Sequence, residues 1–435
     1  MLGLCSLGFF TLLLICLLNG ISVSWALLGG LLLFWGYGRR RGYSHRELAK
    51  MAWGELKKGL IVVVVVFLIG IITGLWRVSG TIAFCIVRGM DLVTPKLFLV
   101  IAFLLCAALS YVLGTSFGVS STMGVILMAI ARSGGVDPVV TAGVVLSGVY
   151  FGDRCSPASS AAVLVATVTD TKLYDNVKMM RRTGLLPTIL AVCIYTALSF
   201  ANPITGVDAS VLASMTDAFS ISWTALLPAA VMLVLPLCKV PIRISMLCSI
   251  AVAALIALAV QDFSVREILF AAWGGYHSEN EALERVMGGG GVLSMMSSYI
   301  IVSLASMYSG ILRGTGALEA LDKKAAGLAG RIGRFPAMIA VTTLCVSVLC
   351  NQAVTVMLGT QLMRGCYTDN SELAQDMENS GIMIAGLIPW SIACSVPLAM
   401  LGSDLRSVPY AVLLWLTPIC YALTKRFFYP GRNMT

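Results

Sequence analysis

The chain has 435 residues, of which 58% are hydrophobic and only 12% are charged, and its formal net charge is +9. An average soluble domain carries about 25% charged residues, so this composition excludes a soluble globular protein and indicates a polytopic membrane protein. The basic residues cluster in a few loops, as the positive-inside rule predicts, and therefore do not indicate a nucleic-acid-binding protein.

Apolar runs near the length of a membrane crossing, about 20 residues, follow one another along the chain. In chain order they are 4–18, 21–37, 60–78, 97–113, 119–132, 138–168 (interrupted), 184–201, 222–238, 244–261, 292–312, 336–358, 381–402 (interrupted) and 408–423. Because several runs are short or broken, we expect an all-α protein with roughly ten to twelve transmembrane helices. No basic residue precedes the first run, which predicts a membrane helix instead of a cleaved signal peptide.

The charged loops predict an orientation in the membrane. Segments 38–59, 170–183 and 313–335 are rich in Lys and Arg and are expected in the cytoplasm. Segments 202–221 and 262–291 are more acidic than basic and are expected outside. The C-terminal end is basic again, so both termini are expected in the cytoplasm.

The two halves of the chain carry the same landmarks in the same order. Pro95 and Pro336 each open an apolar run and lie 241 residues apart, and Pro157 and Pro389 each interrupt a later run and lie 232 residues apart. The first unit follows a cytoplasmic loop and the second an external one, so we expect inverted repeats. Such repeats with broken helices at matching places are typical of secondary transporters and their binding sites. The expected domains are 1–59 (two helices and a basic loop), 60–201 (first repeat), 202–291 (linking helices and external loop) and 292–435 (second repeat and C-terminus).

The first interruption, GDRCSPASS (152–160), places Asp153 and Arg154 beside Pro157. Proline and serine free backbone groups that a ligand can satisfy. A hard cation such as Na⁺ prefers the oxygen atoms of this segment, whereas an anionic substrate prefers Arg154 and the start of the following helix. A carboxyl group at membrane depth also exchanges protons readily, so Asp153 is the expected place where Na⁺ and H⁺ compete. Alternatively, Asp153 pairs with Arg154 or caps the break, although neighbours on a helix point about 100° apart.

The second interruption spans 378–394, with Glu378 near its start and Trp390 beside its proline. Trp390 either stacks on a substrate or packs at the membrane interface. Asn351 and Gln352 either line the site or bond a neighbouring helix. The expected ion- or substrate-binding residues are Asp153, Arg154, Ser156, Ser159, Ser160, Thr115, Ser116, Asn351, Gln352, Asn379, Ser380, Trp390 and Ser391, with Na⁺ at Asp153, and the expected helix breaks are Gly152, Pro157, Gly381 and Pro389.

The motif GTSFG (114–118) also matches the G-x-S-x-G pattern of serine hydrolases. Its flanks are apolar and the two histidines, His45 and His277, lie in predicted loops, so we expect no enzyme and no cofactor. Small residues of this kind allow close helix packing or ligand contact. A structural or receptor protein is a further alternative, but no sizeable soluble region could carry a signal.

Several of these motifs together resemble the NhaC-type Na⁺/H⁺ antiporter family of the ion-transporter superfamily, which includes malate/lactate-exchanging members. They are GIITGLWRVSGTI (70–82), GTSFG (114–118), SGVYFGDRCSP (147–157), GGGVLSMM (289–296), CNQ (350–352) and ENSG…LIPW (378–390). The resemblance runs from about residue 60 to 425. It implies an inner-membrane Na⁺/H⁺ antiporter that works by alternating access. The alternative is an H⁺- or Na⁺-coupled exchanger or importer of a small carboxylate or amino acid.

The chain departs from the family pattern at two carboxylates. The family's Ser-Asp-Thr-Thr-Asn is here S-S-A-A-V (159–163), so Ser160 replaces an Asp, and the family's Glu-Asp-Ser-Gly has Asn379 at its second position. The family's Trp-Asn-Thr has become W-S-I (390–392). Because oxygen number and charge set the affinity for hard cations, either Asp153 alone suffices for Na⁺ or the chain moves an organic solute coupled to protons.

Overall fold

The computed structural model describes residues 2–19, 21–92, 94–204, 209–317 and 322–429. Within these ranges the regular structure is helical, apart from one isolated bridge between Tyr276 and Gly289. The all-α prediction is therefore confirmed. The last part of the predicted cytoplasmic C-terminus, 430–435, lies outside the described residues.

The helices follow one another with short connections. They are α1 (Leu2–Leu18), α2 (Val23–Arg40), α3 (His45–Val78), α4 (Thr81–Leu92), α5 (Phe98–Leu113), α6 (Ser116–Val119), α7 (Val125–Ser133), α8 (Pro138–Cys155), α9 (Ser160–Thr169), α10 (Leu173–Ala201), α11 (Ala209–Ala218), α12 (Leu227–Leu237), α13 (Ile242–Ala259), α14 (Val265–Gly274), α15 (Glu281–Met287), α16 (Gly291–Ser294), α17 (Met296–Gly314), α18 (Asp322–Ile332), α19 (Arg334–Leu349), α20 (Gln352–Met363), α21 (Asn370–Met377), α22 (Met383–Ala385), α23 (Ile392–Met400) and α24 (Val412–Phe428). Two π-helical turns, η2 (Ser120–Gly124) and η6 (Glu378–Ile382), lie between α6 and α7 and between α21 and α22.

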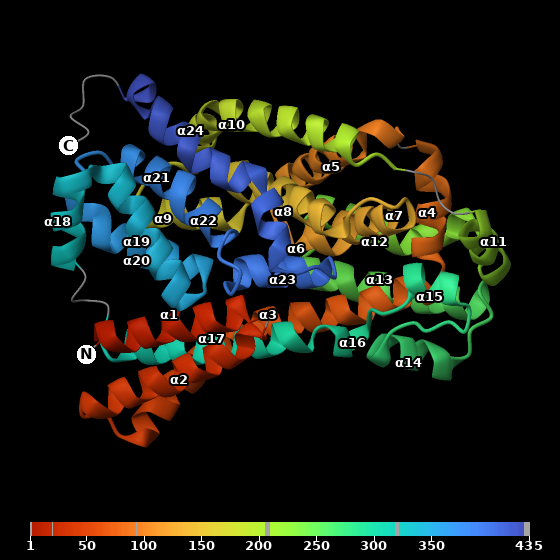
Figure 1. Ribbon diagram of the computed structural model, residues 1–435, viewed down its shortest axis with the longest axis horizontal. Helices are drawn as coiled ribbons and strands as arrows, with labels where there is room; N and C mark the ends of the chain where they lie inside the picture. Colours follow the sequence, from red (N-terminus) through yellow and green to blue (C-terminus); the bar gives the residue numbers. More distant parts are fainter. Residues whose placement is uncertain (1, 20, 93, 205–208, 318–321, 430–435) are drawn as a thin grey trace.

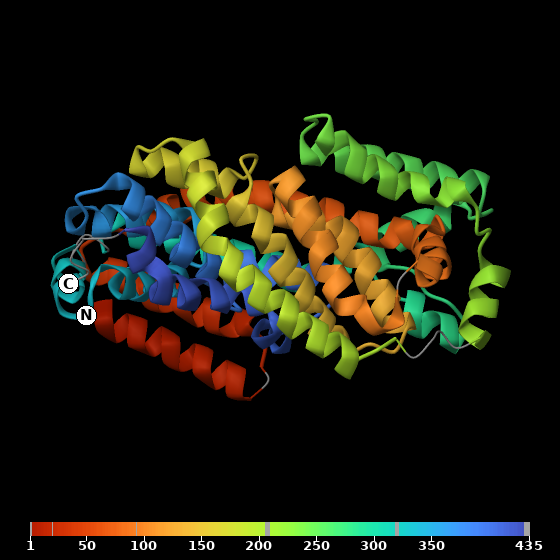
Figure 2. The ribbon, with the colours of Figure 1, turned by 90° about the horizontal axis from the view of Figure 1, so that it is seen from above.

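Long helices enclose a layer of shorter, broken ones (Figure 1). The helices α1, α2, α3 and α17 lie along one long side of the molecule, and α10 packs against α24 on the opposite side. Between them lie α6, α8, α9, α20, α22 and α23. Figure 2 shows the green α12–α13 hairpin along one edge of the molecule. This arrangement places the segments around Pro157 and Pro389 between the outer helices.

Five helical segments in the described ranges are long and apolar enough to cross a membrane: α3, Pro95–Leu113, Ser116–Ser133, α10 and α13. A sixth is reached if the pair Leu212–Ala218 and Trp223–Leu237, bent by 97°, counts as one span. This number is below the ten to twelve crossings predicted, because the runs 138–168, 336–358 and 381–402 are divided into shorter helices and the first and last runs lie in helices of only 17 residues. Large apolar side chains such as Trp25, Leu185 and Leu255 are exposed on the outer helices, where lipid would cover them. The chain is a polytopic membrane protein.

The three predicted basic loops are largely helical in their described parts, and in 313–335 most of the described residues lie in α18. The helix α3 begins at His45, because the Ser44 hydroxyl accepts from the Glu47 N–H and the Glu47 carboxylate accepts from the Ser44 N–H, a capping box. The helix α10 begins at Leu173. Helix periodicity is hidden in 38–59 and 170–183 because most of their side chains are polar.

The two glycines predicted as helix breaks are not breaks. Gly152 lies within α8, and a Cβ atom there would be 2.0 Å from the carbonyl carbon of Ser110 on α5. Gly381 lies within the π-helical turn η6, packed against Met377 and Thr342. Both glycines serve close helix packing, and the chain leaves the helix only after them.

Replacing Gly152 by Ala is expected to destabilise the protein by about 3 kcal/mol or more, because the new methyl group would separate the α5 and α8 backbones. Thermal unfolding of the purified protein in detergent measures this effect. The control is Gly36→Ala in α2, where an added Cβ meets nothing within 4 Å, so that helix propensity leaves stability unchanged or slightly raised. Equal unfolding temperatures for the two variants would contradict the packing argument.

Candidate ion- and substrate-binding site

The first break separates α8 from α9 at 156–159. The Ser159 hydroxyl donates to the Asp153 carbonyl oxygen at 2.5 Å and accepts from the N–H groups of Ala161 and Ala162 at 3.1 and 3.3 Å. One side chain thus satisfies a carbonyl at the end of α8 and two amides at the start of α9. It fixes the geometry of the break beside Asp153.

The second break separates α22 from α23 and has the same local geometry. The Ser391 hydroxyl donates to the Ala385 carbonyl oxygen at 2.5 Å and accepts from the Cys394 N–H at 3.1 Å. In both breaks the serine bonds a carbonyl six residues earlier, and Ser391 follows Ser159 by 232 residues, the offset that also separates the two interrupting prolines. The position that corresponds to Asp153 is therefore Ala385.

Two further breaks, which the sequence did not predict, lie beside these. Gly114 between α5 and α6 and Cys350 between α19 and α20 both have positive φ, 66° and 55°. A Cβ atom on Gly114 would be 2.4 Å from the Ala158 carbonyl carbon, so this turn touches the first break. The Ile392 N–H donates to the Cys350 carbonyl oxygen at 2.8 Å, so the other turn touches the second. Each half of the molecule therefore brings two broken helices together.

Asp153 lies where the two halves meet. Its carboxylate is 5% exposed and accepts from the Gln352 side chain at 3.4 Å, and Gln352 also donates to the Ile382 carbonyl oxygen at 3.3 Å. The side chains of Ser116 and Ser159 lie within electrostatic range of this carboxylate. Three of the predicted residues, Ser116, Ser159 and Gln352, are thus brought to Asp153.

Arg154 points away from Asp153, and the two form no ion pair within the described part of the chain. Its Nη2 donates to the Thr183 hydroxyl and to the Asn379 side-chain oxygen, each at 2.7 Å. Arg154 is 3% exposed, and its Nε has no hydrogen-bond partner among the described residues. Arg154 therefore joins the first break to α10 and to the π-helical turn of the second half. Thr183 was not predicted as a site residue, because it lies in a segment predicted to be a basic loop.

Glu378 is the main functional candidate that the residue-by-residue prediction left out of the site. Its side chain is fully buried, and neither carboxylate oxygen has a hydrogen-bond partner within the described residues. It lies within electrostatic range of both Arg154 and Asp153. Glu378 stands beside Asn379 in ENSG, one of the motifs that resemble the family pattern, and this position could have identified it as a site residue. The site thus holds two buried carboxylates and one buried guanidinium.

Apart from Ser160, the other predicted site residues bond backbone groups. Thr115 and Asn351 cap α6 and α20, and Ser156 accepts from the Ala158 N–H at 3.1 Å within the first break. Ser160 is exposed. The remaining two each donate to a backbone carbonyl: Ser380 to Asp376 at 2.6 Å and Trp390 to Ser347 at 2.8 Å.

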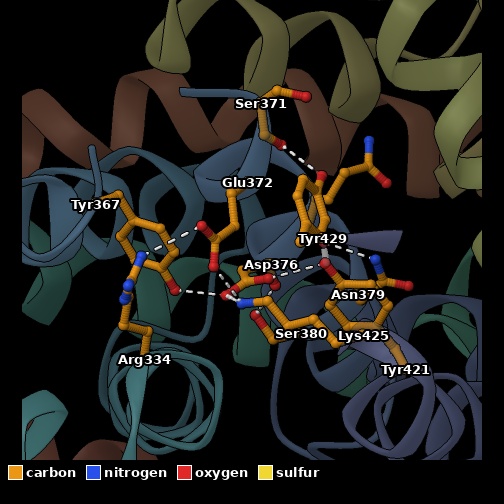
Figure 3. Close-up of polar contacts among 11 residues, drawn as sticks. Arg334, Tyr367, Ser371, Glu372, Asp376, Asn379, Ser380, Tyr421, Lys425 and Tyr429 are labelled. Carbon is orange, nitrogen blue, oxygen red and sulfur yellow. Dashed lines mark hydrogen bonds and ion pairs between the residues drawn. The ribbon is translucent and has the colours of Figure 1, made fainter. Parts of the chain in front are cut away.

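A second polar cluster joins α24 to α21 (Figure 3). The Lys425 ammonium is 2.8 Å from Glu372 Oε1 and 2.5 Å from Asp376 Oδ2. The hydroxyls of Tyr367 and Tyr421 donate to Asp376 at 2.6 and 3.0 Å. Lys425 is 3% exposed, so this ion-pair cluster lies inside the molecule. Asp376 precedes Glu378 by two residues, so this cluster holds the helix that carries the site.

Ser116 has no arrangement for nucleophilic catalysis among the described contacts. Neither histidine contacts it: the His45 ring accepts from the Trp35 indole at 3.0 Å, and the His277 ring bonds Glu284 at 3.0 Å. Ser116 instead belongs to the surroundings of Asp153.

The sequence of the chain is similar to those of known antiporters. A family model described as the Na⁺/H⁺ antiporter family matches residues 1–170 and 148–426. The chain is 25% identical to the malate-2H⁺/Na⁺-lactate antiporter of Bacillus subtilis, over 92% of this chain and 88% of the relative. It is 25% identical to the Na⁺/H⁺ antiporter NhaC of Alkalihalophilus pseudofirmus (91% and 87%) and 25% identical to the arginine/ornithine antiporter ArcD of Halobacterium salinarum (87% and 81%). The chain is a secondary transporter and not an enzyme, and it belongs to the Na⁺/H⁺ antiporter family.

Proposed function

We propose that the chain exchanges Na⁺ for H⁺ at a site formed by Asp153 and Glu378. The observation that carries the proposal is the fully buried Glu378 carboxylate, whose oxygens accept no hydrogen bond from the described residues. A buried carboxylate of this kind is costly unless a proton or a cation neutralises it. With both acids ionised, the two carboxylates and the Arg154 guanidinium leave one net negative charge. One H⁺ or one Na⁺ balances that charge, so that binding of either ion displaces the other.

The proposed exchange uses alternating access between two inverted repeats, 60–201 and 292–435, with 1–59 and 202–291 as flanking and linking segments. The matching serine bonds of the two breaks and the matching positive-φ turns at Gly114 and Cys350 support this division. In such transporters the repeats move around a site fixed near the middle of the membrane.

We further propose that the protein resides in the inner membrane with both termini in the cytoplasm. In Figure 1 the basic helix α18 lies at the same end of the molecule as the start of α1 and the end of α24, while α14 and α15 lie at the opposite end. The described acidic residues Glu279, Glu281 and Glu284 belong to that opposite end. The positive-inside rule assigns the first end to the cytoplasm.

Proteoliposomes with an imposed pH gradient test the proposed exchange. Addition of Na⁺ or Li⁺ is expected to dissipate the gradient, reported by a pH-sensitive dye. Glu378→Gln is expected to reduce the rate to that of empty liposomes, because the amide neither takes up a proton nor balances the charge of a cation. The matched control is Glu279→Gln, an exposed acid in the predicted external loop. A wild-type protein that responds to neither cation would exclude this function.

A second candidate function is the exchange of a small carboxylate or amino acid. It is favoured by Arg154, whose partner Asn379 is neutral and whose Nε has no partner in the described residues, so the guanidinium could bind a solute carboxylate. Two relatives are named for malate, lactate, arginine and ornithine. Accumulation of radiolabelled malate, lactate and arginine, with and without Na⁺, distinguishes this function from cation exchange.

Replacing Asn379 by Asp is expected to separate the two functions. The new carboxylate would pair with Arg154, 2.7 Å away in the present structure, and would release Glu378 from the field of the guanidinium. A site with one more negative charge should bind Na⁺ about tenfold more tightly, measured as a lower apparent KM in the proteoliposome assay. The same change should abolish any transport of a carboxylate solute. An unchanged KM for Na⁺ would show that the ion does not sense this part of the site.

A further inference from the structure

A cavity of about 270 Å³ lies apart from the Asp153 site, at the end of the molecule that carries α15. Its lining includes Arg77 and Arg132, together with Thr73, Gly290, Ser294 and Gly402, and no acidic side chain is among the described lining residues. Two guanidinium groups around one cavity repel each other, and a repulsion of this kind is relieved when an anion binds between them.

Arg77 is held rigidly at the end of α3. It is 9% exposed, its Nε donates to the Met287 carbonyl oxygen at 2.7 Å, and its Nη1 donates to the Thr73 carbonyl oxygen. A Cβ atom on Gly290, whose φ is 80°, would be 2.8 Å from this Nη1, so the glycine loop packs directly against the guanidinium. The Nη2 group makes no hydrogen bond within the described part of the chain, which leaves a donor available to a ligand.

Arg132 is held in the same manner at the end of α7. Its Nη2 donates to the carbonyl oxygens of Leu401 and Gly402 at 3.1 and 2.9 Å. Its Nε and Nη1 donate to no other described residue. Both arginines are therefore fixed by neutral carbonyl groups, which orient them without cancelling their charge.

Among the described residues, the acid that interacts electrostatically with Arg77 is Glu284. Glu284 bonds the His277 ring at 3.0 Å and the Ser278 N–H at 2.7 Å. Two guanidinium groups thus stand against one carboxylate among the described residues, which leaves a net positive charge around the cavity. A neighbouring cavity of about 610 Å³ shares Ser294, Ala399 and Gly402 with it and extends to Pro389 in the second break.

We propose that the cavity between Arg77 and Arg132 is a binding site for a small carboxylate anion. The planar forks of two guanidinium groups match the two oxygens of a carboxylate. A volume of about 270 Å³ is slightly below the range of about 300–1,000 Å³ typical of pockets for drug-sized ligands, which suits an anion of few heavy atoms. Two arginines in the wall disfavour a free cation. This anion site shares no residue with the proposed cation site at Asp153 and Glu378.

Binding of malate and lactate to the purified protein, measured by titration calorimetry, tests this proposal. Both anions are expected to bind saturably, and Arg132→Gln is expected to weaken that binding about tenfold or more. The control is Arg88→Gln, an exposed arginine on α4 that lines neither cavity. Asp153→Asn should leave the binding unchanged while it abolishes cation exchange, so failure of one proposal does not resemble failure of the other.

A second measurement needs no variant. Phenylglyoxal modifies arginine side chains, and mass spectrometry of the wild-type protein follows the rate at each site. Malate should slow the modification of Arg132 and should leave the rate at Arg88 unchanged. Absence of saturable binding, equal binding by Arg132→Gln, or modification of Arg132 that malate does not slow would overturn the proposal. Chloride or sulfate that binds as tightly at matched ionic strength would overturn the assignment to carboxylates.

Discussion

Asp153→Asn is expected to reduce Na⁺-driven proton movement to the level of empty liposomes. The amide occupies the same volume and can still bond the Gln352 side chain, which lies 3.4 Å from the carboxylate. It can neither take up a proton nor balance the charge of Na⁺, so the exchange loses the group for which the two ions compete. The assay is the dissipation of an imposed pH gradient after addition of Na⁺.

The matched control is Asp170→Asn at the other end of α9. Asp170 is exposed and has φ of 54°, a conformation that Asn adopts readily, so neither folding nor transport should change. A Na⁺ response that survives in Asp153→Asn would show that another group carries the ion. The folded state of the variant is checked by gel filtration in detergent.

Lys425→Met is expected to lower the free energy of unfolding by about 3–5 kcal/mol. Lys425 is 3% exposed and contacts both Glu372 and Asp376, and Arg334 lies 3.3 Å from Glu372, so that two cations balance two buried acids. Removal of one cation leaves a buried acid without compensation. Denaturant or thermal unfolding in detergent measures the loss.

Lys58→Met serves as the control for this second prediction. Lys58 forms an ion pair with Glu55 at 2.9 Å, but its side chain is 69% exposed, so water screens the pair. Its removal should cost at most about 1 kcal/mol. Similar losses for the two variants would mean that the cluster around Lys425 is solvated and does not hold α24 to α21.

The proline-based part of the site could be predicted from the sequence. Pro157 and Pro389 interrupt apolar runs, and the chain does leave the helix around each of them. Gly152 and Gly381 were wrong as breaks, because glycine in a membrane helix also permits close backbone contact, and spacing alone does not distinguish the two uses.

The breaks at Gly114 and Cys350 were hidden because neither contains proline. The available signal was the cap residue that follows each of them, Thr115 and Asn351, whose side chains accept from N–H groups of the next helix. The burial of Glu378 and the pairing of Arg154 with Thr183 and Asn379 depend on contacts between distant segments. No local pattern reports such contacts.

Backbone contact between α5 and α8 limits how the molecule can move. Added Cβ atoms on Gly148 and Gly152 would lie 2.8 Å from the Phe103 carbonyl oxygen and 2.1 Å from the Ser110 carbonyl oxygen. Sliding one helix along the other would bring a larger side chain against these carbonyl groups, so α5 and α8 move together as one rigid unit. The Ser159 hydroxyl ties the Asp153 carbonyl oxygen at the end of α8 to the Ala161 and Ala162 N–H groups at the start of α9, so the break adds no free joint to this unit. Asp153 would then move together with α5, α8 and the start of α9.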